Sequence, residues 1–211
     1  QFDYCINCAA YTAVDLAETQ SELAYAVNAK GVKILAQICH HYQVTLIHIS
    51  TDFVFDGQKK MAYTEQDIAN PLGVYGSSKL QGEQYLGELM TRFFIVRTSW
   101  LYSEYGNNFL KTMLKLSETM GEINVVSDQI GSPTYARDLA KALIKIILSS
   151  STNYGVYHYS NSGAISWHDF AVEIFKQFGK KTYVKPIKTK DYPTAAKRPE
   201  YSDLDKKKIE S

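Results

Sequence analysis

Short apolar segments alternate along this chain with longer segments in which apolar residues recur every three or four positions. The first pattern is typical of buried β-strands and the second of amphipathic helices. The sequence predicts strands at residues 5–8, 45–49, 93–97, 123–126 and 155–159, and helices at 21–42, 74–90, 107–119, 135–149 and 167–178. Parallel strands are joined by such crossover helices, so we expect an α/β fold with a doubly wound parallel sheet.

Polar or small side chains follow three of the predicted strands directly. They occupy residues 7–11, 50–52 and 98–100. In an open α/β sheet, ligands bind in the crevice outside the carboxyl ends of the strands. The sequence therefore predicts that these three segments converge on one crevice, and that this crevice is the binding site.

Tyr75 and Lys79 lie four residues apart in a predicted helix, so they share one face of it. An unperturbed phenol has a pKa of about 10, and a neighbouring cation lowers that value. This pair suits the exchange of a proton with an oxygen atom of a substrate near neutral pH. Both residue types are common, and the segments 50–52 and 97–100 on either side strengthen the prediction.

Composition excludes several other classes of protein. The 211 residues are 45% hydrophobic with a net charge of +1, which supports a folded core and disfavours nucleic acid or an anionic membrane surface as partner. No apolar run approaches about 18 residues, so we expect no membrane span. Three cysteines form no disulfide framework, and we expect Cys5 and Cys8 to be core thiols. No histidine has a second ligand residue at the spacing of a metal site, so no metal is expected. The cysteine usage predicts a cytoplasmic location.

The chain resembles the extended short-chain dehydrogenase/reductase family, and within it the reductases of dTDP-linked 4-keto sugars. The Tyr-x-x-x-Lys pair identifies only the superfamily. The Asp-Gln-x-Gly-x-Pro-Thr segment at 128–134 and the Arg-Pro-x-Tyr-Ser segment at 198–202 are more particular to that branch. The other matching segments are residues 7–15, 17–18, 26–28, 50–57, 75–83 and 97–100.

Two departures from the family pattern matter. The glycine-rich turn that holds a dinucleotide phosphate does not occur, so we expect the N-terminal βαβ part to be missing, and the chain alone to be inactive. Phe53 stands where a tyrosine is common.

The resemblance implies a partial Rossmann-like cofactor part at residues 1–102 and about 134–162, with a smaller mixed substrate-binding region at about 103–133 and 163–211.

The resemblance implies reduction of the 4-keto group of a dTDP-4-dehydro-6-deoxyhexose to dTDP-L-rhamnose, with NADPH or NADH as cofactor. It also implies that the chain can form a homodimer. Tyr75 would be the general acid, Lys79 would bind the nicotinamide ribose and lower the tyrosine pKa, and Thr51 would orient the substrate carbonyl. Implied cofactor contacts are Ala9, Ala10, Tyr11, Asn28, Ser50, Tyr75, Lys79, Thr98 and Ser99. Implied substrate contacts are Thr51, Asp52 and Trp100, with Asn108, Arg137 and Arg198 as candidates for the diphosphate.

Two alternatives share the fold. A sugar-nucleotide epimerase or dehydratase would keep Tyr75 and Lys79, but dehydratases usually add a second carboxylate where Phe53 follows Asp52 here. A non-catalytic regulatory subunit would bind a partner enzyme instead. The presence of Thr51, Tyr75 and Lys79 favours catalysis over that second alternative.

Overall fold

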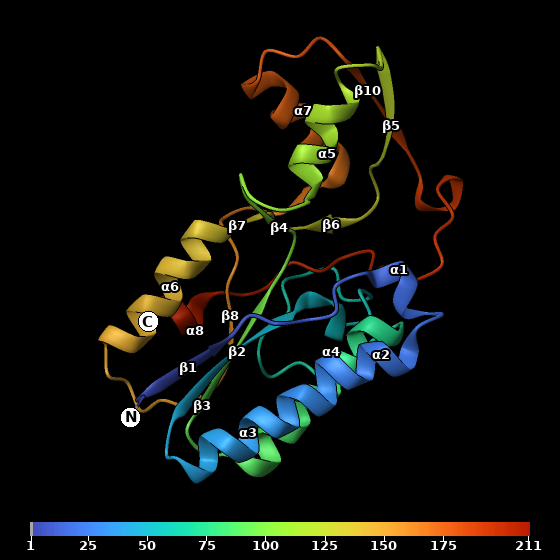
Figure 1. The fold of residues 1–211 in the computed structure, drawn as a ribbon. Coiled ribbons are helices and arrows are strands. Elements are labelled where there is room, and N and C mark those ends of the chain that lie inside the picture. Colours follow the sequence, from blue (N-terminus) through green and yellow to red (C-terminus); the bar gives the residue numbers. More distant parts are fainter. Residues whose placement is uncertain (1) are drawn as a thin grey trace.

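The structure is a computed structural model that describes residues 2–211. Its largest sheet contains β1 (Tyr4–Asn7), β2 (Thr45–Thr51), β3 (Phe93–Thr98) and β8 (Gly155–His158), all parallel and in the order β1-β2-β3-β8 (Figure 1). The parallel α/β sheet predicted from the alternation is confirmed. The sequence predicted every strand of this sheet. Each strand is a nearly continuous apolar run, as burial on both faces requires.

Helices cover both faces of this sheet. One face carries α2 (Ser21–Tyr25), the π-helical segment η1 (Ala26–Gly31), α3 (Val32–His41) and α4 (Val74–Leu89). The other face carries α6 (Ala136–Leu148). Neighbouring residues of a strand point to opposite faces. The core clusters show this: Leu46 packs with α3 and α4, whereas Ile47 packs with α6.

A second region lies beyond the carboxyl end of the sheet (Figure 1). Here α5 (Phe109–Leu116) and α7 (Trp167–Gln177) pack on the parallel pair β5 (Glu122–Val126) and β10 (Tyr183–Ile187). The sequence did not predict β10, which is mostly exposed and contains Lys185 and Pro186. It forms because its backbone pairs with β5.

Short elements connect the two regions. The pair β4 (Leu101–Tyr102) and β7 (Thr134–Tyr135) is parallel, and the pair β6 (Ile130–Gly131) and β9 (Ile165–Ser166) is antiparallel. The remaining elements are α1 (Val14–Ala17), the 3-10 segments η2 (Asp52–Val54) and η3 (Thr189–Asp191), and α8 (Lys207–Glu210). The strand pairs are thus both parallel and antiparallel, as expected of a mixed region.

Two expectations about local structure need correction. The helix predicted at 21–42 forms, but η1 interrupts its regular hydrogen bonding around Asn28. Cys8 is exposed, because β1 ends at Asn7 and the chain leaves the sheet there, so the prediction of a core thiol is wrong for Cys8. Within residues 2–211, no helix is both long and apolar enough to cross a bilayer.

Helix α4 sits unusually close to its neighbours. A Cβ atom on Gly76 would overlap the carbonyl oxygen of Phe53, and one on Gly82 would overlap that of Asn28. The first turn of α4 is held by Glu18, whose Oε1 accepts a hydrogen bond from the backbone N–H of Val74 at 2.9 Å. A carboxylate at a helix N-terminus is favourable because unpaired N–H groups lie there. These contacts fix the helix that carries Tyr75 and Lys79.

Candidate active site

The carboxyl ends of β1, β2 and β3 lie side by side, as the sequence predicted. Asn7 pairs with His48 across β1 and β2, and Thr51 pairs with Thr98 across β2 and β3. The residues that follow these positions, including Ala9 and Asp52, therefore share one edge of the sheet. Helix α4 contacts β2 and η2 at the same edge, which brings Tyr75 to it.

Tyr75 and Thr51 form the centre of the site. The ring of Tyr75 packs edge-on against Phe53, with centroids 5.5 Å apart. Burial raises the pKa of Tyr75 to about 12, although the nearby Thr51 hydroxyl acts in the opposite direction. The expectation that a neighbouring lysine lowers this pKa is therefore wrong, since desolvation of the phenolate is the larger effect. Tyr75 is a neutral hydrogen-bond donor near pH 7.

Asp52 lies beside this pair and is almost fully buried, at 2% exposure. Thr51 donates a hydrogen bond from Oγ1 to Asp52 Oδ1 at 3.2 Å, whereas Oδ2 has no hydrogen-bond partner among the described residues. Burial raises the pKa of the Asp52 carboxyl to about 6, and the nearby hydroxyls of Ser202 and Thr51 act in the opposite direction. An unpaired buried acceptor is costly, so it indicates a place for a ligand donor.

Lys79 is also buried. Its Nζ donates to the carbonyl oxygen of Ile49 at 2.7 Å and lies 3.4 Å from Nε2 of His48. Burial lowers the pKa of Lys79 to about 8, with Glu83 and Cys8 raising it in opposition. His48 was not predicted as a site residue, because inside an apolar strand it looks like a core histidine.

Glu83 is a second residue that the sequence analysis missed. It accepts hydrogen bonds from Nη2 of Arg97 at 2.6 Å and from the hydroxyl of Ser50, all in a buried environment. Its position four residues after Lys79 on the same helix was the available signal. Ser50 was expected to contact the cofactor, but its hydroxyl is committed to Glu83.

The predicted cofactor contacts fall into two groups. Ala9 is exposed at the end of β1, and Ala10 and Tyr11 are partly exposed, so all three are accessible to a ligand. Asn28 is not: it is fully buried, and its side chain binds the backbone N–H and C=O of Tyr11 at 2.8 and 3.0 Å. Asn28 therefore positions the Tyr11 segment, and its direct contact with a cofactor stays a prediction that its burial does not favour.

Thr98 and Ser99 are also buried at the end of β3. Their hydroxyls donate to Thr134 Oγ1 at 3.3 Å and to the Ser132 carbonyl at 2.7 Å. These bonds join the main sheet to the segment at 128–134. The hydroxyls are used within the protein, so contact of either residue with a nicotinamide stays a prediction that their burial does not favour.

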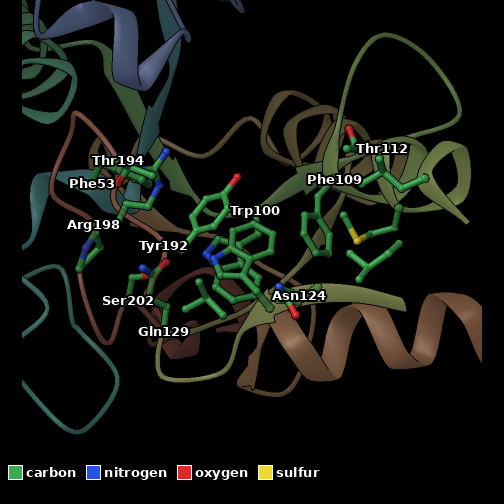
Figure 2. A pocket seen from close by; sticks show the side chains of 17 residues that line it. Phe53, Trp100, Phe109, Thr112, Asn124, Gln129, Tyr192, Thr194, Arg198 and Ser202 are labelled. Atoms are coloured by element: carbon green, nitrogen blue, oxygen red, sulfur yellow. The ribbon is translucent and has the colours of Figure 1, made fainter. Parts of the chain in front are cut away.

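A cavity of ≈ 350 Å³ lies next to this edge, between the sheet and the second region. Figure 2 shows Trp100 and Tyr192 in its middle, Arg198 at one end and Thr112 at the other. Trp100 stacks on Trp167 with centroids 3.5 Å apart. The further lining residues are Phe53, Phe109, Met113, Leu116, Ile123, Asn124, Val125, Val126, Gln129, Thr194, Pro199 and Ser202.

Trp100 lines this cavity, and its contact with a substrate stays a prediction. It adopts a left-handed backbone conformation, with φ of 47°, and Gly131 leaves room for its indole: a Cβ there would lie 2.7 Å from the ring. Of the three diphosphate candidates, only Arg198 lines the cavity, and it also pairs with Asp15 at 2.7 Å. Asn108 instead caps α5, and Arg137 is exposed on α6.

No group of three or more His, Cys, Asp or Glu residues between positions 2 and 211 is arranged to hold a metal ion. A tyrosine and a lysine one turn apart on a helix, at the carboxyl edge of a doubly wound parallel sheet, define a protein of the short-chain dehydrogenase/reductase class. More particularly, the profile of the RmlD substrate binding domain matches residues 1–211, and the chain belongs to that family.

The proteins similar to this chain include dTDP-4-dehydrorhamnose reductases. The chain is 47% identical to a dTDP-4-dehydrorhamnose reductase of Aggregatibacter actinomycetemcomitans, over 97% of this chain and 73% of that protein. It is 43% identical to the spore coat polysaccharide biosynthesis protein SpsK of Bacillus subtilis, over 100% and 73%. Among solved structures, dTDP-4-dehydrorhamnose reductase of Bacillus anthracis in complex with NADP is 45% identical, with a TM-score of 0.96 over 99% of this chain and 73% of that one.

Proposed function

We propose that this protein reduces the 4-keto group of a dTDP-4-dehydro-6-deoxyhexose to the alcohol of dTDP-L-rhamnose, with NADPH or NADH as cofactor. The observation that carries the proposal is a neutral phenol, Tyr75, near the Thr51 hydroxyl and one helical turn before Lys79, at the sheet edge where a largely apolar cavity begins at Phe53. Relatives named dTDP-4-dehydrorhamnose reductase, one of them crystallised with NADP, support it.

The residues at the strand ends fit a nicotinamide cofactor. The amine of Lys79 gives only one of its hydrogen atoms to the Ile49 carbonyl, so further donors are free for ribose hydroxyls. Ala9 and Ala10 have small side chains at the end of β1, which lets a flat ring approach the backbone. When bound, the nicotinamide supplies the hydride that the keto carbon receives.

The chain itself supplies the proton. Tyr75 keeps its proton near neutral pH and can donate it from Oη to the C4 oxygen of the sugar as negative charge develops there. Thr51 donates to Asp52 in this structure, and rotation of its hydroxyl would direct that hydrogen bond to the same oxygen. Asp52 Oδ2, which has no partner among the described residues, can accept a hydrogen bond from a sugar hydroxyl.

The cavity suits the rest of a sugar nucleotide. Its stacked Trp100 and Trp167 present an apolar wall of the kind on which sugar and base rings pack. Arg198 at one end offers a planar guanidinium, which matches phosphate oxygens in charge and geometry. This arrangement favours a nucleotide diphosphate sugar over a small free ketone.

A coupled assay tests the proposal. The protein, supplied before residue 1 with the glycine-rich βαβ part of the family, is given NADPH and a dTDP-4-dehydro-6-deoxy sugar generated in place, and both cofactor oxidation and sugar product are followed. We expect oxidation of NADPH matched by formation of the alcohol. Tyr75→Phe removes the proton donor and should lower the rate about 10²- to 10⁴-fold. The control is Tyr85→Phe, which removes a phenol from the same helix outside the site.

Each contrary result has a clear meaning. Isomerised sugar without cofactor oxidation would favour the epimerase alternative. Absence of any turnover by a folded protein that binds the cofactor would reject the reductase proposal.

A further inference from the structure

The segment 192–199, which we call the strap, forms one wall of the cavity without any helix or strand of its own. Tyr192, Thr194 and Arg198 line the cavity from this segment (Figure 2). Within residues 2–211, the hydrogen bonds that join residues 193–199 to another segment all end on the carboxylate of Asp15 in α1. Asp15 is therefore the polar anchor of this wall, and the proposed reaction gives it no role.

The contact between Asp15 and Arg198 is a two-point contact. Asp15 Oδ1 accepts from Arg198 Nη1 at 3.1 Å and Oδ2 accepts from Nη2 at 2.7 Å. Oδ1 also accepts from the backbone N–H of Ala196 at 3.0 Å, and Nη1 donates to the Ala196 carbonyl at 3.1 Å. Two parallel bonds fix the plane of a guanidinium, as one charge contact does not. The hydrogen bond from Arg198 lowers the pKa of Asp15, so the carboxyl is ionised near pH 7.

The remaining donors of Arg198 form an unused fork. A guanidinium has five N–H groups. Both hydrogens of Nη1 and one hydrogen of Nη2 are taken by Asp15 and Ala196. The N–H of Nε and the second hydrogen of Nη2 point to the same side of the group, and no residue between 2 and 211 accepts from them. Such a pair matches two oxygens of a phosphate in charge and geometry.

The ion pair itself gives little stability to the fold. The side chains of Asp15 and Arg198 are 45% and 24% exposed, and ion pairs at such exposure contribute little to the free energy of unfolding. Its clearer consequence is geometric, since it sets the orientation of a cavity-lining guanidinium. A carboxylate also repels a phosphate, so simple charge would exclude Asp15 from the neighbourhood of a phosphate site.

We propose that Asp15 is a positioning residue: it holds Arg198 in the cavity wall with the fork of Nε and Nη2 free for the diphosphate of a sugar nucleotide. This inference rests on the proposed function, which assigns the diphosphate to Arg198. Orientation and charge predict opposite signs. Removal of the Asp15 charge should weaken diphosphate binding if orientation dominates, and strengthen it if charge dominates.

Calorimetric titration with dTDP tests the sign without cofactor or turnover. The protein of the coupled assay is used throughout. Arg198→Gln removes the fork and should raise the Kd for dTDP about tenfold or more. Asp15→Asn keeps the size of the side chain but places an amide N–H opposite Nη2, so two donors oppose each other. We expect the Kd to rise about 3- to 10-fold, although the site gains positive charge.

Glu200→Gln is the matched control for charge. It removes one carboxylate beside the strap, and the Glu200 side chain makes no hydrogen bond within residues 2–211. Its backbone carbonyl, which accepts from Ile130 N–H at 2.8 Å, is kept. The Kd for dTDP should stay unchanged or fall slightly.

A double variant separates positioning from a general role in holding the strap. If Asp15 acts through Arg198, Asp15→Asn should have no further effect on the Kd in the Arg198→Gln protein. A loss that persists there would show that Asp15 acts on the whole strap. In the coupled assay, Asp15→Asn should raise KM for the sugar nucleotide and leave kcat unchanged, because the diphosphate does not change during the reaction.

Several results would overturn this inference. They are no dTDP binding by folded wild type, unchanged or tighter binding by Asp15→Asn, an equal loss in Glu200→Gln, or a loss that persists without Arg198. If Asp15→Asn does not fold, the ¹⁵N signal of Arg198 Nε in wild type decides. This signal is assigned by its absence from Arg198→Lys, and it should shift when dTDP binds. An unmoved signal would overturn the inference.

The outcomes also separate this inference from the proposed function. Reductase turnover combined with dTDP binding that does not depend on Asp15 would reject the positioning role alone. Binding of dTDP that depends on Asp15, without any oxidation of NADPH, would reject the reductase and leave the positioning role standing.

Discussion

At the residue scale, burial decides the protonation of the site more than neighbouring charges do. It raises the pKa of Tyr75 to about 12, lowers that of Lys79 to about 8 and raises that of Asp52 to about 6. Each shift favours the uncharged form, because a low-dielectric environment penalises charge. Near neutral pH this leaves a protonated phenol, an amine close to its titration point and a carboxylate with one oxygen that has no partner among residues 2–211.

The Asp52 carboxylate should therefore reduce stability. Its pKa in the folded protein is above the unfolded value of about 3.9, so the folded state binds the extra proton between those values. Stability is lost as pH rises through this window. Asp52→Asn should be more stable than wild type by about 1–3 kcal/mol at pH 7.5, with a smaller difference at pH 4.5, by urea unfolding at both pH values. A difference that does not change with pH would contradict this prediction.

At the element scale, the close docking of α4 depends on two glycines. Gly76 and Gly82 let the helix backbone approach the carbonyl oxygens of Phe53 and Asn28. Asn28 itself lies in the π-helical segment and holds the Tyr11 backbone, so α4, η1 and the end of β1 form one connected unit. Hydrogen bonds and backbone contacts place Tyr75 here, and α4 has only a weak amphipathic pattern.

Alanine substitutions along α4 test this docking. Gly76→Ala and Gly82→Ala should each lower the free energy of unfolding by about 1–3 kcal/mol, because the added methyl group forces the helix outward. Gly87→Ala on the same helix has no atom within 4 Å of the added Cβ and should raise it by about 0.4–1 kcal/mol. Urea unfolding of the three variants measures both signs, and equal effects at all three positions would argue against close docking.

At the scale of the whole molecule, helices cover both faces of the main sheet, and neutral histidines lie in its interior. His48 in β2 and His158 in β8 are each fully buried. Burial, with the nearby Arg97 guanidinium, lowers the pKa of His158 to about 3. Its Nδ1 lies 3.0 Å from the carbonyl oxygen of Tyr63, which joins the sheet to the loop before α4.

This interior should make the fold sensitive to acid. An unfolded histidine binds a proton near pH 6.5, but folded His158 does not until about pH 3, so its contribution is lost as pH falls through that interval. From pH 7.5 to 5.5, wild type should lose about 1.4 kcal/mol more stability than His158→Gln. Urea unfolding at both pH values gives this difference. Both proteins contain Asp52, so its effect on stability cancels. The exposed His41→Gln should match wild type, and equal pH dependence in His158→Gln would contradict the prediction.

Features set by local pattern were predictable from the sequence. The runs 45–49 and 93–97 are apolar at nearly every position, so both faces of each strand must be buried. The sequence therefore predicted interior strands there. The spacing of Tyr75 and Lys79 put both on one face of a helix. The convergence of residues 7–11, 50–52 and 98–100 followed from parallel strand order, because the carboxyl ends of parallel strands share one edge.

Tertiary structure decided what those residues experience. Burial, and not the spacing to Lys79, gave the pKa of Tyr75 its direction. The partners of Asn28 and His48 lie 17 and 41 positions away, at Tyr11 and Asn7, where no local period reaches. The strand β10 and the cavity around Trp100 likewise form only when distant segments meet. Side-chain periodicity determines which face a residue occupies, whereas desolvation and long-range hydrogen bonds determine its chemistry, and these exist only in the folded chain.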